Sequence, residues 1–413
     1  MAGAIFVVAG SGTREQGPVA SLLSTAGWAA ATERVLGRSW VVTPTDVLTP
    51  SAARQRGSDP TLRSRNESSV RRRLPAVAKT AVKDLLHWRL SRRFSIDPHG
   101  PWSGSEVTFV WQRHDLFTTA GLDLARRLGA PSVLFVPAAK VWEAGQWGTT
   151  RPGWGRLLEW RAERPSLVSA DVVAAGSRTV FDQMVRMGVP EERLLLTPTG
   201  VDLELFAEPQ DPAPLRRRLG LEDRFVVGWV GSFRRFHALE QVVEALSALP
   251  GTALLLVGDG PERPRIERLA RNLGVPTVCT GTVAHRELPA HLAAMDAAVV
   301  LAPPGQPFHY SPLKLAEYLA AGLPVVAPAT GQLAERLTDG VDAIVVPPHD
   351  VNTLAAALRR LRDDPEERAR LGKAARAAAE AEWSWEHQAR RVIDALRRPS
   401  SQRHLAGSTP SGT

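Results

Sequence analysis

Cysteine is almost absent from this sequence, whose 413 residues include a single one, Cys279. A lone cysteine excludes an internal disulfide and a thiol-based metal site, and it is consistent with a reducing compartment. Long apolar runs are lacking too, since no segment approaches the roughly 20 uninterrupted apolar residues that a membrane-spanning helix needs. The start, MAGAIFVVAG, has no basic region before its short apolar run. We interpret it as a first strand and expect a cytoplasmic protein.

An acidic excess is also missing, and the positive charge is confined to one segment. The formal net charge is +8, and basic residues outnumber acidic ones by the same margin between residues 63 and 93. The apolar residues Val77, Ala81, Leu85 and Trp88 of this basic segment recur with a helical period. Two interpretations are open: the helix lies on an anionic membrane surface, which would make the protein peripheral on the inner face of the membrane, or its apolar stripe packs on its own domain. Nucleic acid is not expected, because aromatic residues are sparse there and no nucleic-acid-binding motif is present.

Short apolar strands alternate with helical segments in two successive sets. The length fits two domains of about 200 residues, and a turn-rich stretch, PTGVDLELFAEPQDPAP, separates the sets. We therefore predict an α/β protein of two Rossmann-like domains, residues 1–198 and 199–384, each a doubly wound parallel sheet. Ligands of such sheets bind beyond the carboxyl ends of the strands, so a cleft between the domains is the expected site.

Three segments lie outside this alternation. Residues 49–95 form a basic insertion in the first domain, and its Ser/Arg-rich part, residues 49–70, is expected to be a mobile loop. Residues 385–398 are expected to form a final helix. Residues 399–413 lack core residues, so we expect a disordered tail.

The stretch FHYSPLKLAEYLAAGLPVVAPATGQ predicts a short helix followed by a buried strand. Ser311 is a suitable N-cap, Pro312 suits the first helical position, and Gly322 is a typical C-terminal stop. Lys314 and Glu317 lie three residues apart, so they project together. A helix start with a cation favours an anion such as a diphosphate, although a surface pair between the two side chains is the alternative.

A second candidate anion site is the turn GSFRRFHA after the first strand of the second half. Backbone N–H groups at Gly231 and Ser232 and the guanidinium of Arg234 can converge on a phosphate there. The alternative is that Arg234 is a solvated loop charge.

The run SPLKLAEYLAAGLPVV resembles the donor-binding helix of family 4 glycosyltransferases, retaining enzymes of the GT-B fold. The resemblance covers nearly the whole chain and is strongest over 172–396. It implies that the final helix, residues 385–398, crosses back to complete the first domain. It implies transfer of a sugar, with retention, from a nucleoside-diphosphate sugar to an acceptor hydroxyl on a glycan, a lipid-linked molecule or a small molecule. It also implies that Arg234 and Lys314 stabilise the leaving diphosphate, which would be the main catalytic effect, and that Glu317 accepts hydrogen bonds from the ribose diol.

The same resemblance assigns further residues to the two ligands. The second domain would bind the donor and the first the acceptor, whose side of the site would include Gly10, Gly12 and His114. No cofactor or metal is implied, since relatives of this fold work without a metal and no Asp-x-Asp motif lies near the site. The loop at Thr282, Val283 and His285 would receive the nucleotide base. The full set of donor-binding positions is Gly231, Ser232, Thr282, Val283, His309, Tyr310, Ser311, Pro312 and Leu313.

Two departures from the family pattern, at His309 and Pro137, leave a second function open, and a third concerns His237, whose role stays open. His309 stands where the family usually has the first of two glutamates, and Pro137 stands where related enzymes often carry a His or Asn. His237 and Ala238 occupy the place of a Lys-Gly pair. The alternative is therefore a GT-B relative that binds a nucleotide sugar but performs other chemistry or none, such as an epimerase-like protein or a pseudo-glycosyltransferase.

Overall fold

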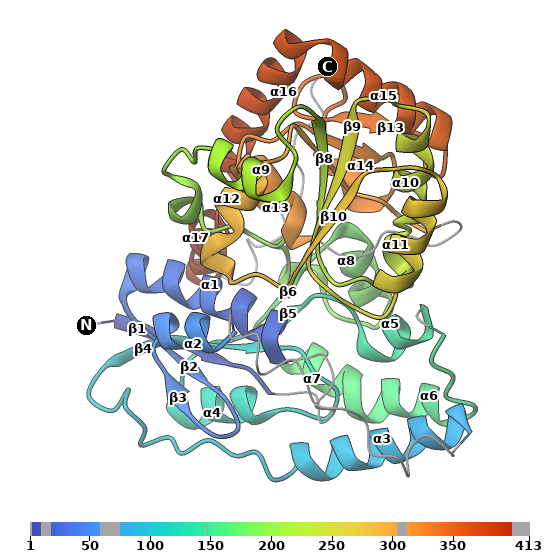
Figure 1. The fold of residues 1–413 in the computed structure, drawn as a ribbon. Coiled ribbons are helices and arrows are strands. Elements are labelled where there is room, and N and C mark those ends of the chain that lie inside the picture. The colour runs from blue at the N-terminus through green and yellow to red at the C-terminus, as the bar shows by residue number, and fades with distance from the viewer. Residues whose placement is uncertain (1, 10–17, 58–74, 147, 304–311, 399–413) are drawn as a thin grey trace. The chain divides into compact units, whose positions relative to one another are not determined.

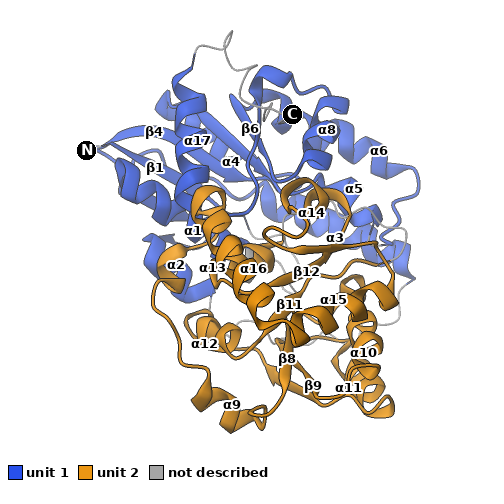
Figure 2. Cartoon of the chain, turned by 90° about the horizontal axis from the view of Figure 1, so that it is seen from above, with its two compact units in different colours: residues 1–200, 309–311, 385–413 blue, residues 201–308, 312–384 orange. Residues whose placement is uncertain are grey.

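The protein is described by a computed structural model, which covers residues 2–9, 18–57, 75–146, 148–303 and 312–398 (Figure 1). The chain divides into two compact units (Figure 2). Unit 1 takes in residues 1–200 and 385–413, and unit 2 takes in residues 201–308 and 312–384. The predicted tail, residues 399–413, lies outside the described residues. Each unit has its own sheet, and the two are described separately.

The sheet of unit 1 has seven strands in the order β3-β2-β1-β4-β5-β6-β7. Its inner strands β1, β5 and β6 are almost wholly buried, so they appear in the sequence as nearly continuous apolar runs. The prediction of a wholly parallel sheet is wrong at one edge, because the two-residue strand β3 pairs antiparallel with β2. The strands are β1 (Ala2–Val7), β2 (Gly37–Val42), β3 (Val47–Leu48), β4 (Glu106–Arg113), β5 (Ser132–Val136), β6 (Val172–Ala175) and β7 (Leu194–Leu196).

The helices of unit 1 include one that the sequence did not indicate. Residues 50–57 form helix α2, so the expected mobile loop is wrong there, and Ala53 in this helix is fully buried; residues 58–70 lie outside the described residues. The helices are α1 (Pro18–Leu36), α2 (Pro50–Gly57), α3 (Ala76–Ser91), α4 (Ala120–Leu128), α5 (Lys140–Gln146), α6 (Trp154–Leu158), the π-helical turn η3 (Glu159–Glu163), α7 (Arg164–Ser169), α8 (Arg178–Arg186) and α17 (Trp385–Arg397).

An aromatic cluster ties the last helix to unit 1. Trp28 of α1 lies 5.6 Å, between ring centroids, from Trp385 of α17 and 6.0 Å from Trp111 of β4. Trp385 fits closely against two glycines: a Cβ at Gly27 would lie 2.4 Å from Trp385 Nε1, and one at Gly200 would lie 2.8 Å from the ring. The final helix of the chain therefore belongs to the core of unit 1.

Unit 2 contains six parallel strands in the order β10-β9-β8-β11-β12-β13. The order reverses between β8 and β11, which is the topological switch point where ligands of doubly wound sheets bind. The α/β fold with two doubly wound sheets is confirmed, apart from the antiparallel edge in unit 1. The strands are β8 (Phe225–Val230), β9 (Thr252–Val257), β10 (Thr277–Gly281), β11 (Ala297–Val299), β12 (Val325–Pro328) and β13 (Ile344–Val346).

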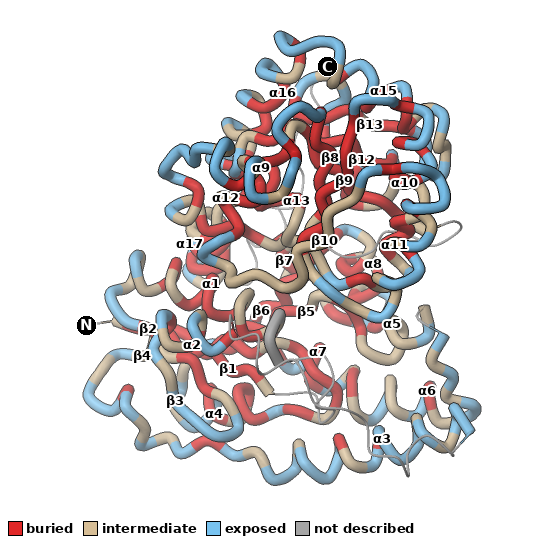
Figure 3. The backbone as a smooth tube through the Cα atoms, in the orientation of Figure 1, coloured by how far each residue is buried: buried red, intermediate tan, exposed pale blue. Residues whose placement is uncertain are grey.

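The strands of unit 2 form its buried centre, as Figure 3 shows. Among the described residues of the whole chain, no helix combines the length and apolar character needed to cross a membrane. The helices of unit 2 are α9 (Ala213–Leu219), α10 (Glu240–Ser247), α11 (Arg263–Asn272), α12 (Leu288–Ala293), α13 (Leu313–Ala320), α14 (Gly331–Arg336), α15 (Val351–Asp363), α16 (Pro365–Ala378) and the π-helical turn η8 (Ala379–Trp383).

Candidate functional site

Helix α13 ends where the sequence predicted. The N–H of Leu323 donates to the carbonyl of Tyr318 at 3.0 Å, and the N–H of Gly322 donates to Leu319 at 2.9 Å. Gly322 has φ +65°, and this pair of bonds defines a Schellman C-terminus. The assignment of Gly322 as the stop is confirmed.

The start of the helix differs from the prediction. Leu313 is the first helical residue, and Pro312 is the N-cap with extended backbone angles, φ −77° and ψ 117°, rather than the first helical residue. Five of the predicted site positions, Gly10, Gly12, His309, Tyr310 and Ser311, lie outside the described residues, so their roles stay predictions.

Lys314 is buried against an aromatic ring. Its Nζ lies 3.9 Å from the centroid of the Trp229 ring, at the end of β8. Among the described residues Nζ has no hydrogen-bond partner. Burial lowers the pKa of Lys314 to about 7, although the nearby carboxylate of Glu317 acts in the opposite direction. Within the described part of the chain, the charged form of this ammonium is therefore stabilised by the nearby Glu317 carboxylate but by no hydrogen bond.

The turn after β8 lies directly against Lys314. A Cβ at Gly231 would come 2.9 Å from Lys314 Nζ, and Gly231 has φ +148°, so only glycine suits this position. Ser232 beside it is exposed. The structure thus brings Gly231 and Lys314 together, as the diphosphate prediction requires.

Arg234 lies in the same turn and is partly exposed. Partial burial lowers the pKa of Arg234 from its ordinary value. Burial lowers the pKa of the nearby His237 well below 6.5. The positive charges of Lys314 and, to a smaller extent, Arg234 lower it further. His237 is therefore neutral near pH 7, and its ring packs on Trp229 at 5.1 Å. The sequence had left the role of His237 open; here it is a packed, uncharged side chain.

The turn GDGPE, which follows β9, packs against the turn after β8. A Cβ at Gly258 would lie 1.9 Å from the carbonyl oxygen of Gly231, and one at Gly260 would lie 2.7 Å from the nitrogen of Phe233. The N–H of Phe233 also donates to the carbonyl of Asp259 at 3.1 Å. The two glycines are therefore required by the close approach of the two strand-end turns.

Glu317 does not form the surface pair with Lys314 that was the alternative prediction. Its side chain is 6% exposed, and its Oε1 lies 2.9 Å from His285 Nε2. The next residue, Tyr318, fixes the helix to β8, because its hydroxyl accepts the N–H of Val230 at 2.7 Å. Helix α13 therefore presents Lys314 to the turn after β8 and Glu317 to the loop after β10.

The loop after β10 contains the positions assigned to the nucleotide base. Thr282 and Val283 follow β10 directly and are half-buried. His285, two residues after Val283, connects this loop to Glu317. The family resemblance placed His285 in this loop. Its pairing with Glu317 was not predicted, because the two residues are distant in sequence.

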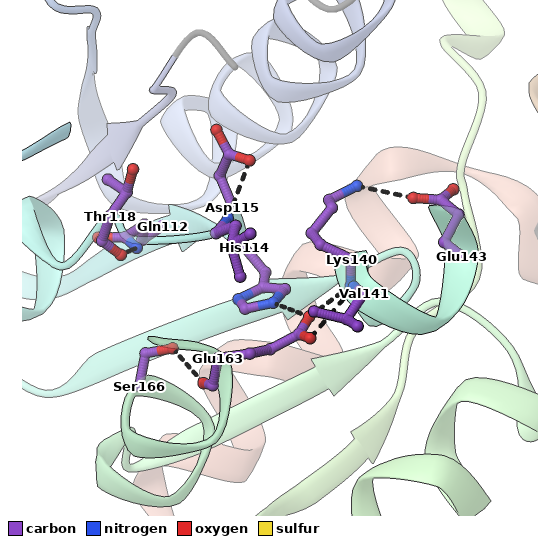
Figure 4. Close-up of polar contacts among 10 residues, drawn as sticks. Gln112, His114, Asp115, Thr118, Lys140, Val141, Glu143, Glu163 and Ser166 are labelled. Carbon is purple, nitrogen blue, oxygen red and sulfur yellow. Dashed lines mark hydrogen bonds and ion pairs between the residues drawn. The ribbon is translucent and has the colours of Figure 1, made fainter. Parts of the chain in front are cut away.

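In unit 1, the predicted acceptor-side residue His114 lies in a buried polar cluster (Figure 4). His114 Nε2 lies 2.8 Å from Glu163 Oε1, and both side chains are fully buried. Glu163 also accepts the backbone N–H groups of Lys140 and Val141 at the start of α5. Burial has the largest single effect on Glu163 and raises its pKa, but the hydrogen bond and charge of His114, together with the backbone N–H groups of Lys140 and Val141, lower the pKa overall. The cluster holds the start of α5, which follows Pro137, and an acceptor role for His114 stays a prediction.

Comparisons with known proteins show which family this chain resembles. Residues 224–364 match the family model described as "Glycosyl transferases group 1". Over this region the chain is similar to the group 1, GT4-type glycosyltransferases. This match covers the strands, turns and helix that carry Gly231, Arg234, Lys314 and Glu317.

Two curated glycosyltransferases are among the most similar relatives. A GDP-mannose-dependent alpha-(1-6)-phosphatidylinositol monomannoside mannosyltransferase of Mycolicibacterium smegmatis is 34% identical over 237 residues, 55% of this chain and 62% of the relative. A D-inositol 3-phosphate glycosyltransferase of Kribbella flavida is 33% identical over 257 residues, 59% of each chain. The chain thus spans about three fifths of the length of these relatives.

Solved structures show the same GT-B fold. The Anabaena HepE protein in complex with UDP and glucose has a TM-score of 0.64 at 18% identity, covering 96% of this chain and 99% of that one. WaaG, a glycosyltransferase involved in lipopolysaccharide biosynthesis, has a TM-score of 0.62 at 17% identity, covering 95% and 99%. At these identities the likeness concerns the fold alone.

Proposed function

We propose that this protein is a retaining hexosyltransferase that moves a sugar from a nucleoside-diphosphate sugar to an acceptor hydroxyl. The observation that carries the proposal is the buried ammonium of Lys314, which has no hydrogen-bond partner among the described residues and lies beside the glycine turn at Gly231. A diphosphate there would supply the missing negative charge.

The reaction breaks the bond between the anomeric carbon and the diphosphate oxygen, and it joins the acceptor oxygen to that carbon on the same face. The acceptor proton passes to the departing phosphate oxygen. Negative charge grows on the diphosphate as the bond breaks, so Lys314 and Arg234 stabilise the transition state more than the bound donor. We propose that the reaction needs no metal ion, because these two cations neutralise the leaving group. Activity that survives EDTA would support this, and loss of activity restored by a divalent ion would contradict it.

Glu317 is proposed to bind the ribose of the donor, with the base in the loop at Thr282 and Val283. The relatives named above include a protein dependent on GDP-mannose and one solved with UDP. The direct test is incubation with GDP-mannose, UDP-glucose and other nucleotide sugars, with measurement of nucleoside diphosphate release in the presence of candidate acceptors. Proton NMR of the product then reports whether the anomeric configuration is retained.

A second candidate is a nucleotide-sugar binder that transfers nothing, and it is favoured by Pro137 at the position of a common family His or Asn. This candidate predicts thermal stabilisation by nucleotide sugars without acceptor-dependent release of the diphosphate. An epimerase-like relative would instead convert the sugar without an acceptor.

We further propose that the acceptor is lipid-linked and that helix α3 contacts an anionic membrane. The helix is attached to unit 1 by its polar side: Asp84 accepts two hydrogen bonds from Arg151, at 2.8 and 3.0 Å. It accepts a third from Trp154 Nε1 at 3.0 Å. His87 Nε2, one turn further along α3, lies 3.2 Å from Asp115 Oδ2.

The apolar side chains of α3 point away from the unit. Leu85 is 54% exposed and Trp88 is 39% exposed, and Figure 3 shows the helix as mostly exposed. These residues belong to the stripe whose packing onto its own domain was the alternative prediction, and that alternative is wrong for the described part of the helix. The neighbouring segment that follows Trp154 adds Leu157 and Trp160, which are 55% and 60% exposed.

Basic residues flank this apolar face. Lys79, Lys83 and Arg89 on α3 are exposed, and Arg161 follows Trp160 in the sequence. Exposed tryptophan and leucine with lysine and arginine around them suit the headgroup region of an anionic bilayer. The rest of the basic segment, residues 63–74, lies outside the described residues.

Vesicle cosedimentation tests the contact. Wild-type protein should bind phosphatidylcholine vesicles that contain phosphatidylglycerol, less so at higher salt, and bind pure phosphatidylcholine weakly. Replacing Lys79, Lys83 and Arg89 by Ser should weaken binding roughly a hundredfold, at about 1 kcal/mol per charge. Val341→Ser, at an exposed apolar residue of unit 2, is the matched control for a Leu85→Ser variant. Unchanged binding after both sets of replacements would rule this surface out.

A further inference from the structure

The carboxylate of Glu317 is held by one particular side chain. Glu317 Oε1 lies 2.9 Å from His285 Nε2, and the Glu317 side chain is 6% exposed while that of His285 is 23% exposed. A buried carboxylate keeps a single orientation when a ring nitrogen binds one of its oxygens. The other acceptor positions of the carboxylate then remain available to a ligand.

The loop that carries His285 is itself fixed. The N–H of Gly258 donates to the carbonyl of Gly281 at 2.8 Å where β10 ends. The N–H of Ala284 donates to the carboxylate of Glu287 at 3.3 Å, and the ring of His291 lies 2.8 Å from the Glu287 carbonyl oxygen. His285 therefore reaches Glu317 from a loop anchored on both sides.

We propose that His285 is a positioning residue for nucleotide recognition, which holds Glu317 in the orientation that accepts both hydroxyls of the donor ribose. The inference rests on the proposed function, because it assigns a role at the same nucleotide site. His285 also connects the loop that faces the base with the carboxylate that faces the ribose. Pre-orientation of a binding group reduces the ordering that the ligand must impose, so its loss appears in ligand affinity.

The 2′-hydroxyl gives a direct readout of this role. A 2′-deoxynucleotide cannot make one of the two hydrogen bonds to Glu317, and a hydrogen bond to a charged group is worth about tenfold or more in affinity. Wild-type protein should therefore bind GDP, UDP or ADP about tenfold tighter than the matching 2′-deoxy form. A residue that only maintains the fold would change both affinities together, whereas a positioning residue changes their ratio.

The experiment is calorimetric titration of these nucleotides and of inorganic pyrophosphate into five forms of the full chain. In His285→Ala the ribo-to-deoxy ratio should fall at least about threefold, while pyrophosphate affinity stays near wild type. His285→Gln, which keeps an N–H donor of similar reach, should restore most of the ratio, and His285→Asn, which is shorter, should not. Arg286→Ala, at the exposed neighbouring residue, is the control and should behave as wild type.

Non-additivity completes the test. Glu317→Gln should itself reduce the ratio, and adding His285→Ala to it should cause little further loss, because both changes act on one contact. If His285→Ala does not fold, the comparison of His285→Gln with His285→Asn carries the same test. A nucleotide that binds but keeps its ratio in His285→Ala and His285→Asn overturns this inference and leaves the proposed function standing. A wild-type protein that binds none of the three nucleotides overturns both.

Discussion

The Nζ of Lys314 lies 3.9 Å from the centroid of the Trp229 ring. A cation over an aromatic face gains electrostatic stabilisation, but far less than water or a carboxylate would provide. No described residue accepts a hydrogen bond from this ammonium, which lies where the donor diphosphate is proposed to bind. Two of the predictions below follow from this contact.

The first concerns stability and pH. The pKa of Lys314 falls from 10.5 to about 7 on burial, so between these values the unfolded chain binds one more proton than the folded chain. The cost of burying the ammonium is present in full below about pH 7 and disappears as the pH rises toward 10.5. The free energy of unfolding should therefore rise with pH, by up to about 1.4 kcal/mol per unit from this group. Lys314→Met should lack this slope in urea denaturation, whereas the exposed control Lys83→Met should keep it.

The second concerns the ligand. A diphosphate favours the charged form of Lys314, so above about pH 7 its binding should be accompanied by proton uptake, and its affinity should decrease as the pH rises. Titration in two buffers of different ionisation enthalpy measures the number of protons taken up. Equal apparent enthalpies in the two buffers would show that Lys314 does not change its protonation state.

The third separates the two parts of the nucleotide. Lys314→Ala should weaken the nucleoside diphosphate and leave the free nucleoside nearly unaffected, whereas Glu317→Gln should weaken both. Because charge on the diphosphate grows in the transition state, Lys314→Ala and Arg234→Ala should lower kcat and kcat/KM together, by roughly 2–4 kcal/mol or thirty- to a thousandfold. Glu317→Gln should act mostly on the donor KM. A Lys314→Ala protein that binds the diphosphate as wild type does would remove α13 from the phosphate site.

The fourth concerns backbone strain at Ala238, which has φ +47° and ψ +42° and is buried. A left-handed conformation costs an L-residue about 1–2 kcal/mol. Glycine avoids this cost, but it loses more conformational entropy on folding, so the net gain is smaller. Ala238→Gly should therefore stabilise the protein by roughly 0.5–1 kcal/mol. Ala245→Gly, the same change inside helix α10, should destabilise it by about 1 kcal/mol. Chemical denaturation of the two variants gives the comparison, and equal signs would contradict the strain.

The fifth concerns the attachment of α17. A Cβ at Gly27 would lie 2.4 Å from Trp385 Nε1, so Gly27→Ala must displace the tryptophan and should cost about 1–3 kcal/mol. Trp385→Ala should cost about 3–5 kcal/mol through the cavity that it leaves. Gly145→Ala, where no atom lies within 4 Å of the added Cβ, is the matched control. A Gly27→Ala protein as stable as this control would show that the packing tolerates the methyl group.

Much of the fold could be predicted because parallel strands buried on both faces leave a strong signal. The start MAGAIFVVAG was interpreted as a first strand, and β1 covers Ala2–Val7. Helix α2 could not be predicted in this way, because its sequence, PSAARQRG, is mostly polar and only Pro50, Ala53 and Gly57 are buried. The edge strand β3 is two residues long and leaves no pattern.

Helix α3 shows why a periodic pattern is not enough. The apolar period over Val77, Leu85 and Trp88 correctly predicted a helix, but not which side of it packs. That side is decided by Asp84, whose partners Arg151 and Trp154 lie far away in sequence. Pairings of this kind depend on the assembled fold.

The candidate site shows the same difference between local features, which could be predicted, and contacts between distant residues, which could not. The sequence and the family resemblance brought Lys314, Glu317 and Gly231 to attention, since residue type and spacing relative to a helix start are local features. The partners Trp229 and His285 were not assigned to them, because a cation over a ring and a carboxylate beside an imidazole arise from separate strands and loops. Glu163 was missed for the same reason, since nothing in its neighbourhood indicates His114.

The return of α17 to unit 1 affects the order in which the units can be completed during synthesis. All of unit 2 is synthesised between Gly200 and Trp385. Trp28 of α1 therefore cannot contact Trp385 until the whole of unit 2 has been synthesised. At about 5–20 residues per second this interval is roughly ten to forty seconds. We expect unit 2 to reach its native state first, with the nascent unit 1 depending on chaperones until the last helix emerges. Limited proteolysis of ribosome-bound chains stalled before Trp385 would show a resistant unit 2 beside a cleavable unit 1.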